Sequence, residues 1–432
     1  MDYPLSPSAQ SKLPVPQLPQ PQQTGTPPQL TGPQPSEQPG PPSPLLGKAP
    51  PLPLSLPMYR RLQKNPALLQ EWQKGLNPVT SKPAPPPALR RSGSAAPVGG
   101  TWTQGPSAPG NPPLSNPLLL TDGTVIAYVS CTGTWWKLTP DFTGSYINGS
   151  WSQIASLPSG YTPRFFSSAL LPDGRVIVEG GEYNTGCVEA WTNLGAIYDP
   201  LFNTWTSITP PTGWSNIGDA QATVLANGTY MQSNALSTHQ ALLNPSSLTW
   251  TATGTGKADG DDEEGWTLLP DKSVLTVDAF TTGGCGTNTE RYSPVTGAWT
   301  SAGSTPSILA DCGAGATFEL GPQVLRPDGT AVAFGGTTCG KSCLPLNTTV
   351  ITPSAIFNSA TSLWAAGPNI PQVSGNNYTL ADAPAALLPN GNVLFAASPN
   401  YNAFVFPTHF FEVSTANSIA QVADPPSDAD RL

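Results

Sequence analysis

The chain contains few charged residues, few histidines and no long apolar run. Of its 432 residues, 10% are charged, with 18 Lys and Arg against 27 Asp and Glu and a net charge of −9. Binding to a phosphate backbone depends on Lys and Arg, so this balance argues against nucleic acid as a partner. No stretch reaches the roughly 18 apolar residues of a membrane-spanning helix. The N-terminus also lacks the apolar segment of a signal peptide.

Several catalytic motifs are missing as well. The sequence has no nucleotide-binding fingerprint, no phosphate-binding loop, no GxSxG elbow and no visible Ser-His-Asp arrangement. These absences favour a protein that binds its ligand without converting it.

Proline is abundant and is concentrated near the N-terminus. There are 53 prolines, and residues 1–95 lack the apolar periodicity that would bury a core. We predict a disordered, polyproline-II-like arm over 1–95. A short helix is expected within it near 66–74, because Asn65 is an N-cap residue and Pro66 suits the first helical position. Residues 96–432 form the folded domain.

A repeated unit fills the folded domain. Its tight turns lie in 118–128, 170–181, 224–233, 268–278, 324–336 and 387–397. Five contain Asp-Gly or Asn-Gly between alternating apolar residues, a strong hairpin signal because both residues tolerate positive φ. The exception is Asp271-Lys272.

Most units continue with a second pair of strands. A YDP-like turn and a tryptophan strand are clear at 196–208, 241–253, 291–302 and 355–367. Four strands per unit predict an all-β propeller with six visible repeat units. With its double glycines and spaced aromatics, the stretch 116–413 resembles kelch repeats, especially the central propeller of galactose-oxidase-like proteins.

That resemblance implies copper-radical chemistry, but the copper ligands are not evident. The family uses two histidines, a Tyr cross-linked to Cys and an axial Tyr. Here the two histidines, His239 and His409, occupy equivalent repeat positions, which favours a structural role. We therefore expect no copper cofactor and no copper-dependent oxidation of alcohols or aldehydes.

Acidic residues recur where each unit enters its innermost strand. Aligning the units on their turns places Arg164, Gly218, Asp262, Glu319 and Ala381 in one register and Phe165, Asp219, Glu263, Leu320 and Asp382 in the next. With Glu264, up to six carboxylates gather at one channel mouth, a setting that suits a cation or a polyol. Alternatively, these acids point into solvent or accept backbone N–H groups.

The ligand-binding candidates lie on the face that carries the b–c and d–a loops, where strands a to d run from the centre outward. They are Arg164, Asp219, Glu263, Glu264, Glu319, Asp382, Tyr183, Trp191 and Tyr401. We expect a monomeric, non-catalytic binding module for a glycan or a protein. The alternative is a galactose-oxidase-like or other carbohydrate-active enzyme, since two carboxylates suffice for glycoside hydrolysis.

One acidic run is a candidate calcium site. In Asp259-Gly-Asp-Asp-Glu-Glu264, the side chains of Asp259, Asp261 and Glu264 are candidate ligands. The run lacks the full twelve-residue EF-hand spacing. A solvated loop is the alternative.

The six cysteines fall in loops of the same face. This placement favours the disulfides Cys131–Cys187, Cys285–Cys312 and Cys339–Cys343 and an oxidising compartment. We expect an extracytoplasmic or secreted protein, although no signal peptide is visible.

The ring must also close. Thr101-Trp102-Thr103 copies the outer strand Thr204-Trp205-Thr206 but precedes the first unit. We predict an incomplete seven-bladed propeller with a gap between the sixth unit and the first. The alternative is a closed six-bladed ring in which 101–106 pairs with 409–413.

Overall fold

The structure, a computed structural model, describes residues 100–279, 284–312, 318–337, 350–400 and 405–426. The Pro-rich arm, the short helix predicted within it, Cys339, Cys343 and Tyr401 lie outside the described residues. Within the described part, no helix is long and apolar enough to span a membrane.

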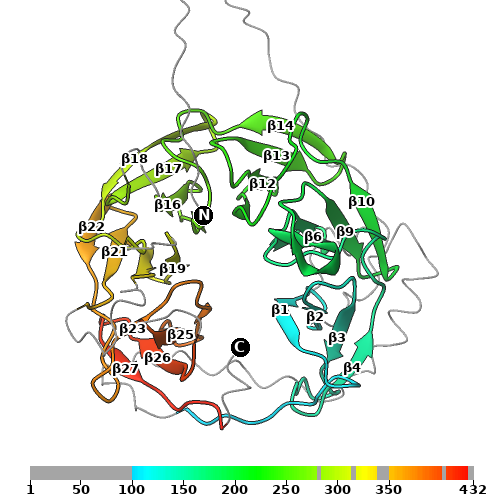
Figure 1. Cartoon of the computed structure of the whole chain (residues 1–432), viewed down its shortest axis with the longest axis horizontal. Coiled ribbons are helices and arrows are strands. Elements are labelled where there is room, and N and C mark those ends of the chain that lie inside the picture. The colour runs from blue at the N-terminus through cyan, green and yellow to red at the C-terminus, as the bar shows by residue number, and fades with distance from the viewer. Residues whose placement is uncertain (1–99, 280–283, 313–317, 338–349, 401–404, 427–432) are drawn as a thin grey trace, which may run out of the picture. The chain divides into compact units, whose positions relative to one another are not determined.

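The described chain is a β-propeller with six blades, one for each of the six repeat units found in the sequence. Its sheets succeed one another around a common centre in chain order (Figure 1), and the strands of each blade pair antiparallel. Blade 1 contains β1 (Leu114–Leu119), β2 (Val125–Val129), β3 (Trp135–Thr139) and β4 (Ser150–Gln153). Blade 2 contains β5 (Ser167–Leu170), β6 (Val176–Glu179), β9 (Gly195–Asp199) and β10 (Thr204–Ile208). Blade 3 contains β11 (Ala222–Val224), β12 (Tyr230–Ser233), β13 (Gln240–Asn244) and β14 (Thr249–Thr253).

The second half of the ring repeats the pattern. Blade 4 contains β15 (Thr267–Leu268), β16 (Val274–Val277), β17 (Asn288–Ser293) and β18 (Ala298–Ser304). Blade 5 contains β19 (Leu320–Leu325), β20 (Thr330–Gly335), β21 (Ser354–Asn358) and β22 (Leu363–Ala366). In blade 6, β23 (Tyr378–Thr379) and β24 (Ala385–Leu387) both pair with β25 (Val393–Pro399), followed by β26 (His409–Val413) and β27 (Ile419–Gln421). A small hairpin, β7 (Tyr183–Asn184) and β8 (Val188–Glu189), projects from blade 2.

The hairpin turns differ in one respect from the sequence prediction. Only the second residue of each Asp-Gly or Asn-Gly pair has positive φ, as at Gly123 with φ 82°. The first residue instead accepts a backbone N–H with its side chain, as Asp122 does from Thr124 at 2.9 Å. The loop is therefore a three-residue turn ending in a left-handed residue. It does not require positive φ at both central residues.

Lys272 holds this left-handed position in blade 4 with φ 75°. A left-handed conformation costs an L-residue about 1 kcal/mol relative to glycine, partly offset by the greater freedom of glycine in the unfolded chain. We expect Lys272→Gly to stabilise the protein by about 0.5 kcal/mol, measured by urea unfolding. The matched control Gly329→Lys should destabilise it, and an unchanged midpoint in both variants would contradict this account.

The hydrophobic core lies between consecutive blades. The residue two positions after each turn is fully buried against the preceding blade in blades 2 to 6: Val176, Tyr230, Val274, Ala331 and Val393. Its equivalent in blade 1, Val125, is half-buried, and Leu119 beside it is 61% exposed. Among the described residues, no core cluster joins blade 6 to blade 1.

Residues 101–106 connect blade 6 to blade 1. In blades 2 and 3, the outer tryptophan donates its indole N–H to the chain just after the outer strand of the preceding blade, as Trp205 does to Ala155 O at 2.9 Å. Trp151 of blade 1 donates in the same way to Pro106 O at 2.8 Å, and Trp102 donates to Ala423 O after β27 at 2.6 Å. The segment thus takes the contacts of an outer strand. No backbone hydrogen bond joins it to 409–413 in the described structure, so the pairing expected for the closed ring is not found.

Candidate functional site

A left-handed residue precedes the innermost strand in blades 2 to 6. The residues are Phe165, Gly218, Glu263, Phe318 and Asp382, with φ between 49° and 71°. Such φ values strain every residue except glycine and are concentrated at functional sites. They also correct the sequence alignment, because Gly218 and Phe318 share the position of Glu263. Asp219 and Glu319 therefore each follow the left-handed residue.

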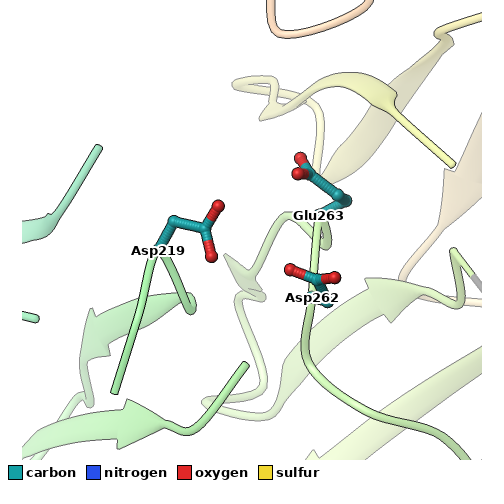
Figure 2. Close-up of side chains that lie close together, drawn as sticks. All are labelled: Asp219, Asp262 and Glu263. Atoms are coloured by element: carbon teal, nitrogen blue, oxygen red, sulfur yellow. The ribbon is translucent and has the colours of Figure 1, made fainter. Parts of the chain in front are cut away.

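Five carboxyl groups converge where these segments meet. We call this set the acid mouth: Asp219, Asp262, Glu263, Glu319 and Asp382. Oxygens of the first three lie within 4.8 Å of one another, as do oxygens of the last three, and Glu263 belongs to both groups. Figure 2 shows Asp219 and Asp262 turned toward the same space from opposite sides. The sequence placed all five at this mouth, and the structure brings them together.

The acid mouth holds protons at neutral pH. Burial is the main cause that raises the pKa of Asp219 to about 6 and that of Asp262 to about 7, helped by the neighbouring carboxylates. Burial also raises the pKa of Glu263 and of Glu319. Glu263 donates a hydrogen bond to Glu319, which further raises the pKa of Glu263. The set therefore mixes protonated and ionised carboxyl groups.

Some carboxyl oxygens in the acid mouth have no partner. Asp219 Oδ1, Asp262 Oδ1 and Glu319 Oε2 are shielded from solvent and accept no hydrogen bond from the residues that the structure describes. Unpaired buried oxygens cost free energy, and a donor from a ligand would remove that cost.

Arg164 and two aromatic rings lie beside the acid mouth in blade 2. The guanidinium carbon of Arg164 is 4.3 Å from the ring centre of Phe165 and 5.8 Å from that of Tyr183. Burial and the charge of Asp219 raise the pKa of Glu182, whereas the charge of Arg164 lowers it. Glu182 therefore interacts electrostatically with both Asp219 and Arg164. Phe165 is 48% exposed. It was not among the predicted ligand contacts, although its register position beside Glu263 pointed to it.

Trp191 has a packing role in the structure. It is half-buried against Ile217, Ala220 and Ala235, and a Cβ at Gly218 would lie 2.7 Å from its ring. Gly218 is needed there because the indole occupies the space of a side chain.

Glu264 does not join the acid mouth. It is 1% exposed, and its Oε1 is 2.9 Å from the ammonium nitrogen of Lys257. Asp259 and Asp261 are also buried, at 7% and 0% exposure. The three candidate calcium ligands of the acidic run are therefore interior, which excludes the solvated loop considered as the alternative for them.

Two predicted disulfides are confirmed. Cys131–Cys187 joins loops of blades 1 and 2, and Cys285–Cys312 joins two loops of blades 4 and 5, with Cα–Cα distances of 5.1 and 5.9 Å. Cys312 lies seven positions before Glu319, an acid of the mouth. The bonds agree with an oxidising environment.

Neither histidine belongs to the acid mouth. His239 directly precedes β13 and is exposed, whereas His409 begins β26 and pairs with Asp424 at 2.6 Å. No group of three or more candidate metal ligands in the described chain includes a histidine.

Comparison with known proteins identifies no family for this chain. No protein-family model and no curated protein sequence matches the chain. A fungal alcohol oxidase of the AA5 family, solved in complex with copper, is similar at 18% identity and a TM-score of 0.47, over 67% of this chain and 59% of the oxidase. YjhT is similar at 13% identity and 0.48, over 69% of this chain and 94% of YjhT. At these values neither similarity indicates an activity.

Proposed function

We propose that the protein is a non-catalytic, extracytoplasmic binding module that takes a glycan at the acid mouth. The observation that carries this proposal is the convergence of five carboxyl groups, three of them with unpaired oxygens, from four blades. A rigid propeller holds these groups in place without the entropy cost of ordering them on binding.

Mixed protonation favours a hydroxyl-rich ligand over a cationic one. A protonated carboxyl group donates as well as accepts, and an ionised one only accepts. Sugar hydroxyls both donate and accept, so they match such a set. The exposed ring of Phe165, stacked under Arg164, offers an apolar surface for a sugar face beside the acids.

The proposal predicts a specific loss of binding. Asp219→Asn should weaken the affinity for a glycan found on an array by about 10- to 100-fold, as expected for a lost charged hydrogen bond, because Asp219, with a pKa of about 6, is largely ionised at pH 7. Titration calorimetry at pH 7 measures this loss. Asp328→Asn, in a turn at the opposite ends of the strands, should bind as the wild type does. Binding of a Lys-rich peptide in place of any glycan would instead identify a protein ligand.

One observation favours a second candidate, glycoside hydrolysis. Asp219 and Asp262 have near-neutral pKa values and oxygens within 4.8 Å of each other. Retaining glycosidases hold their two carboxyl groups about 5 Å apart. Incubating the array ligand with the protein and measuring released reducing ends separates the two candidates. Turnover that Asp262→Asn abolishes would overturn the non-catalytic proposal.

A further inference from the structure

Two sheet faces that the rest of the ring buries are uncovered where blade 6 meets blade 1. Ile126 of blade 1 belongs to the core cluster shared with blade 2, and Val393 of blade 6 belongs to the one shared with blade 5. Side chains alternate along a strand, so Val125 and Leu394 face the other way. Both point toward the space between blades 6 and 1, where Figure 1 shows no strand between the two sheets.

Blade 1 carries an apolar row on its uncovered face. Neighbouring strands pair Leu119 with Val125, Val125 with Leu138, and Leu138 with Trp151, and residues paired in this way share a face. In blades 2 to 6 the equivalents of Leu138 are at most 1% exposed: Tyr198, Leu243, Tyr292, Phe357 and Val413. In blade 1, by contrast, Val125 and Leu138 are only half-buried and Leu119 is 61% exposed.

Blade 6 carries the facing row. It consists of Ala386, Leu394, Glu412 and Ala420, which pair in this order. In blades 1 to 5 the equivalents of Leu394 are 0% exposed: Ile126, Ile177, Met231, Leu275 and Val332. Leu394 itself is half-buried, and Ala386 is exposed. We call these two rows the open interface. An apolar surface of this kind indicates a binding partner.

The N-terminal arm is attached at the rim of the open interface. Trp102 donates to Ala423 O after blade 6, and its ring centre lies 4.9 Å from that of Phe410. Ninety-nine residues precede Gly100. They are therefore tethered beside the open interface, and a tether of this kind raises the local concentration of any docking segment to the millimolar range.

Charge also favours the arm as the occupant. Residues 1–99 contain nine Lys and Arg against three Asp and Glu, a net charge of +6, whereas residues 100–432 carry a net charge of −15. The two parts of the chain therefore attract each other. Glu412 is the one charged residue in the two rows of the open interface.

The arm contains one segment with a helical apolar face. The sequence predicts a helix over 66–74, with Leu68, Leu69 and Trp72 on the same side. A helix this short is marginal in water when its apolar face is uncovered. The 25 residues from Gly75 to Gly99 or Gly100 span up to about 80 Å when extended, so this segment reaches the open interface easily.

We propose that segment 66–74 docks as a helix in the open interface and covers its two apolar rows. The dimensions agree. Sheets stack about 10 Å apart, so one absent sheet leaves about 20 Å between its neighbours. A helix with its side chains is about 10–12 Å wide. Nine helical residues extend for about 14 Å, close to the length of a five-residue strand. This docking does not depend on the proposed glycan function.

Hydrogen exchange of the full chain tests the docking. Amides of 66–74 should exchange about 10-fold or more slowly than in a synthetic peptide of residues 58–76, because only docking stabilises this helix. Leu119→Glu should remove the protection. The matched control Leu363→Glu, at a 66% exposed position in blade 5, should retain it. Protection that survives Leu119→Glu, or that is lost in both variants, would overturn the proposal.

Sedimentation of the same samples identifies other occupants. A monomeric wild type with protected 66–74 agrees with the proposal. A dimer that Leu119→Glu dissociates would assign the open interface to a second copy of the chain. Rapid exchange of 66–74 in a monomer would assign it to a different protein. Either of these last two results would overturn the proposal.

A second readout leaves the propeller sequence unchanged. Leu68→Asp should release the helix, uncover the open interface and raise the fluorescence of the apolar dye anilinonaphthalene sulfonate several-fold. Gln70→Asp adds the same charge on the opposite side of the predicted helix, so it should leave the fluorescence near the wild-type value. Equal fluorescence from the two variants would contradict the docking.

Discussion

Replacing Lys257 by Met is expected to lower the free energy of unfolding by about 3–5 kcal/mol in the presence of a chelator. Its side chain is fully buried and lies within 4 Å of four carboxylates. Removing it leaves those charges without their counter-ion, whereas the volume of the side chain is nearly conserved. Urea unfolding at pH 7 measures the loss.

Controls separate charge from packing in this prediction. Lys137→Met, at a half-buried position in β3, should change stability by well under 1 kcal/mol. Adding Glu264→Gln to Lys257→Met should restore part of the loss, because it removes one unpaired carboxylate. If the double variant is less stable than the single one, the loss is one of packing and the electrostatic account fails.

Raising the pH from 5 to 8 is expected to destabilise the protein by on the order of 3 kcal/mol, with divalent metals removed. Asp219 has a raised pKa of about 6 in the folded protein, and burial likewise raises the pKa of Glu319. The folded state therefore keeps protons that the unfolded state releases near pH 4. The free energy of unfolding is therefore highest below the pKa values of the unfolded chain. It falls as the pH rises through the pKa values of the folded protein.

Denaturant titrations at several pH values measure this dependence. Asp219→Asn should flatten the curve between pH 4 and about 7, because it removes one of the groups that titrate there. The control Asp328→Asn concerns a carboxyl group whose pKa is lowered by its hydrogen bonds to Thr330, so it should not flatten this window. Stability that rises between pH 5 and 8 would contradict the assigned burial of the mouth acids.

The sequence by itself determined the blades, their order and two cross-links. Each hairpin turn needs a residue that adopts positive φ, and the outer strands carry a tryptophan with a fixed partner. Both requirements are local, so both recur visibly in the sequence. The acids at the channel mouth were also predictable, because each lies at the start of an innermost strand. The loop cysteines Cys131, Cys187, Cys285 and Cys312 likewise share one face because of strand direction alone.

Only the tertiary structure decided which acids belong to which site. Glu263 and Glu264 are neighbours in sequence, yet the left-handed backbone at Glu263 separates their side chains. Glu263 joins the acid mouth, and Glu264 turns inward to Lys257. Lys257, Asp278 and Glu290 come from separate segments, and nothing local in the sequence pairs them. A charge buried between blades is stabilised by whatever the fold brings near it, and no local pattern encodes that proximity.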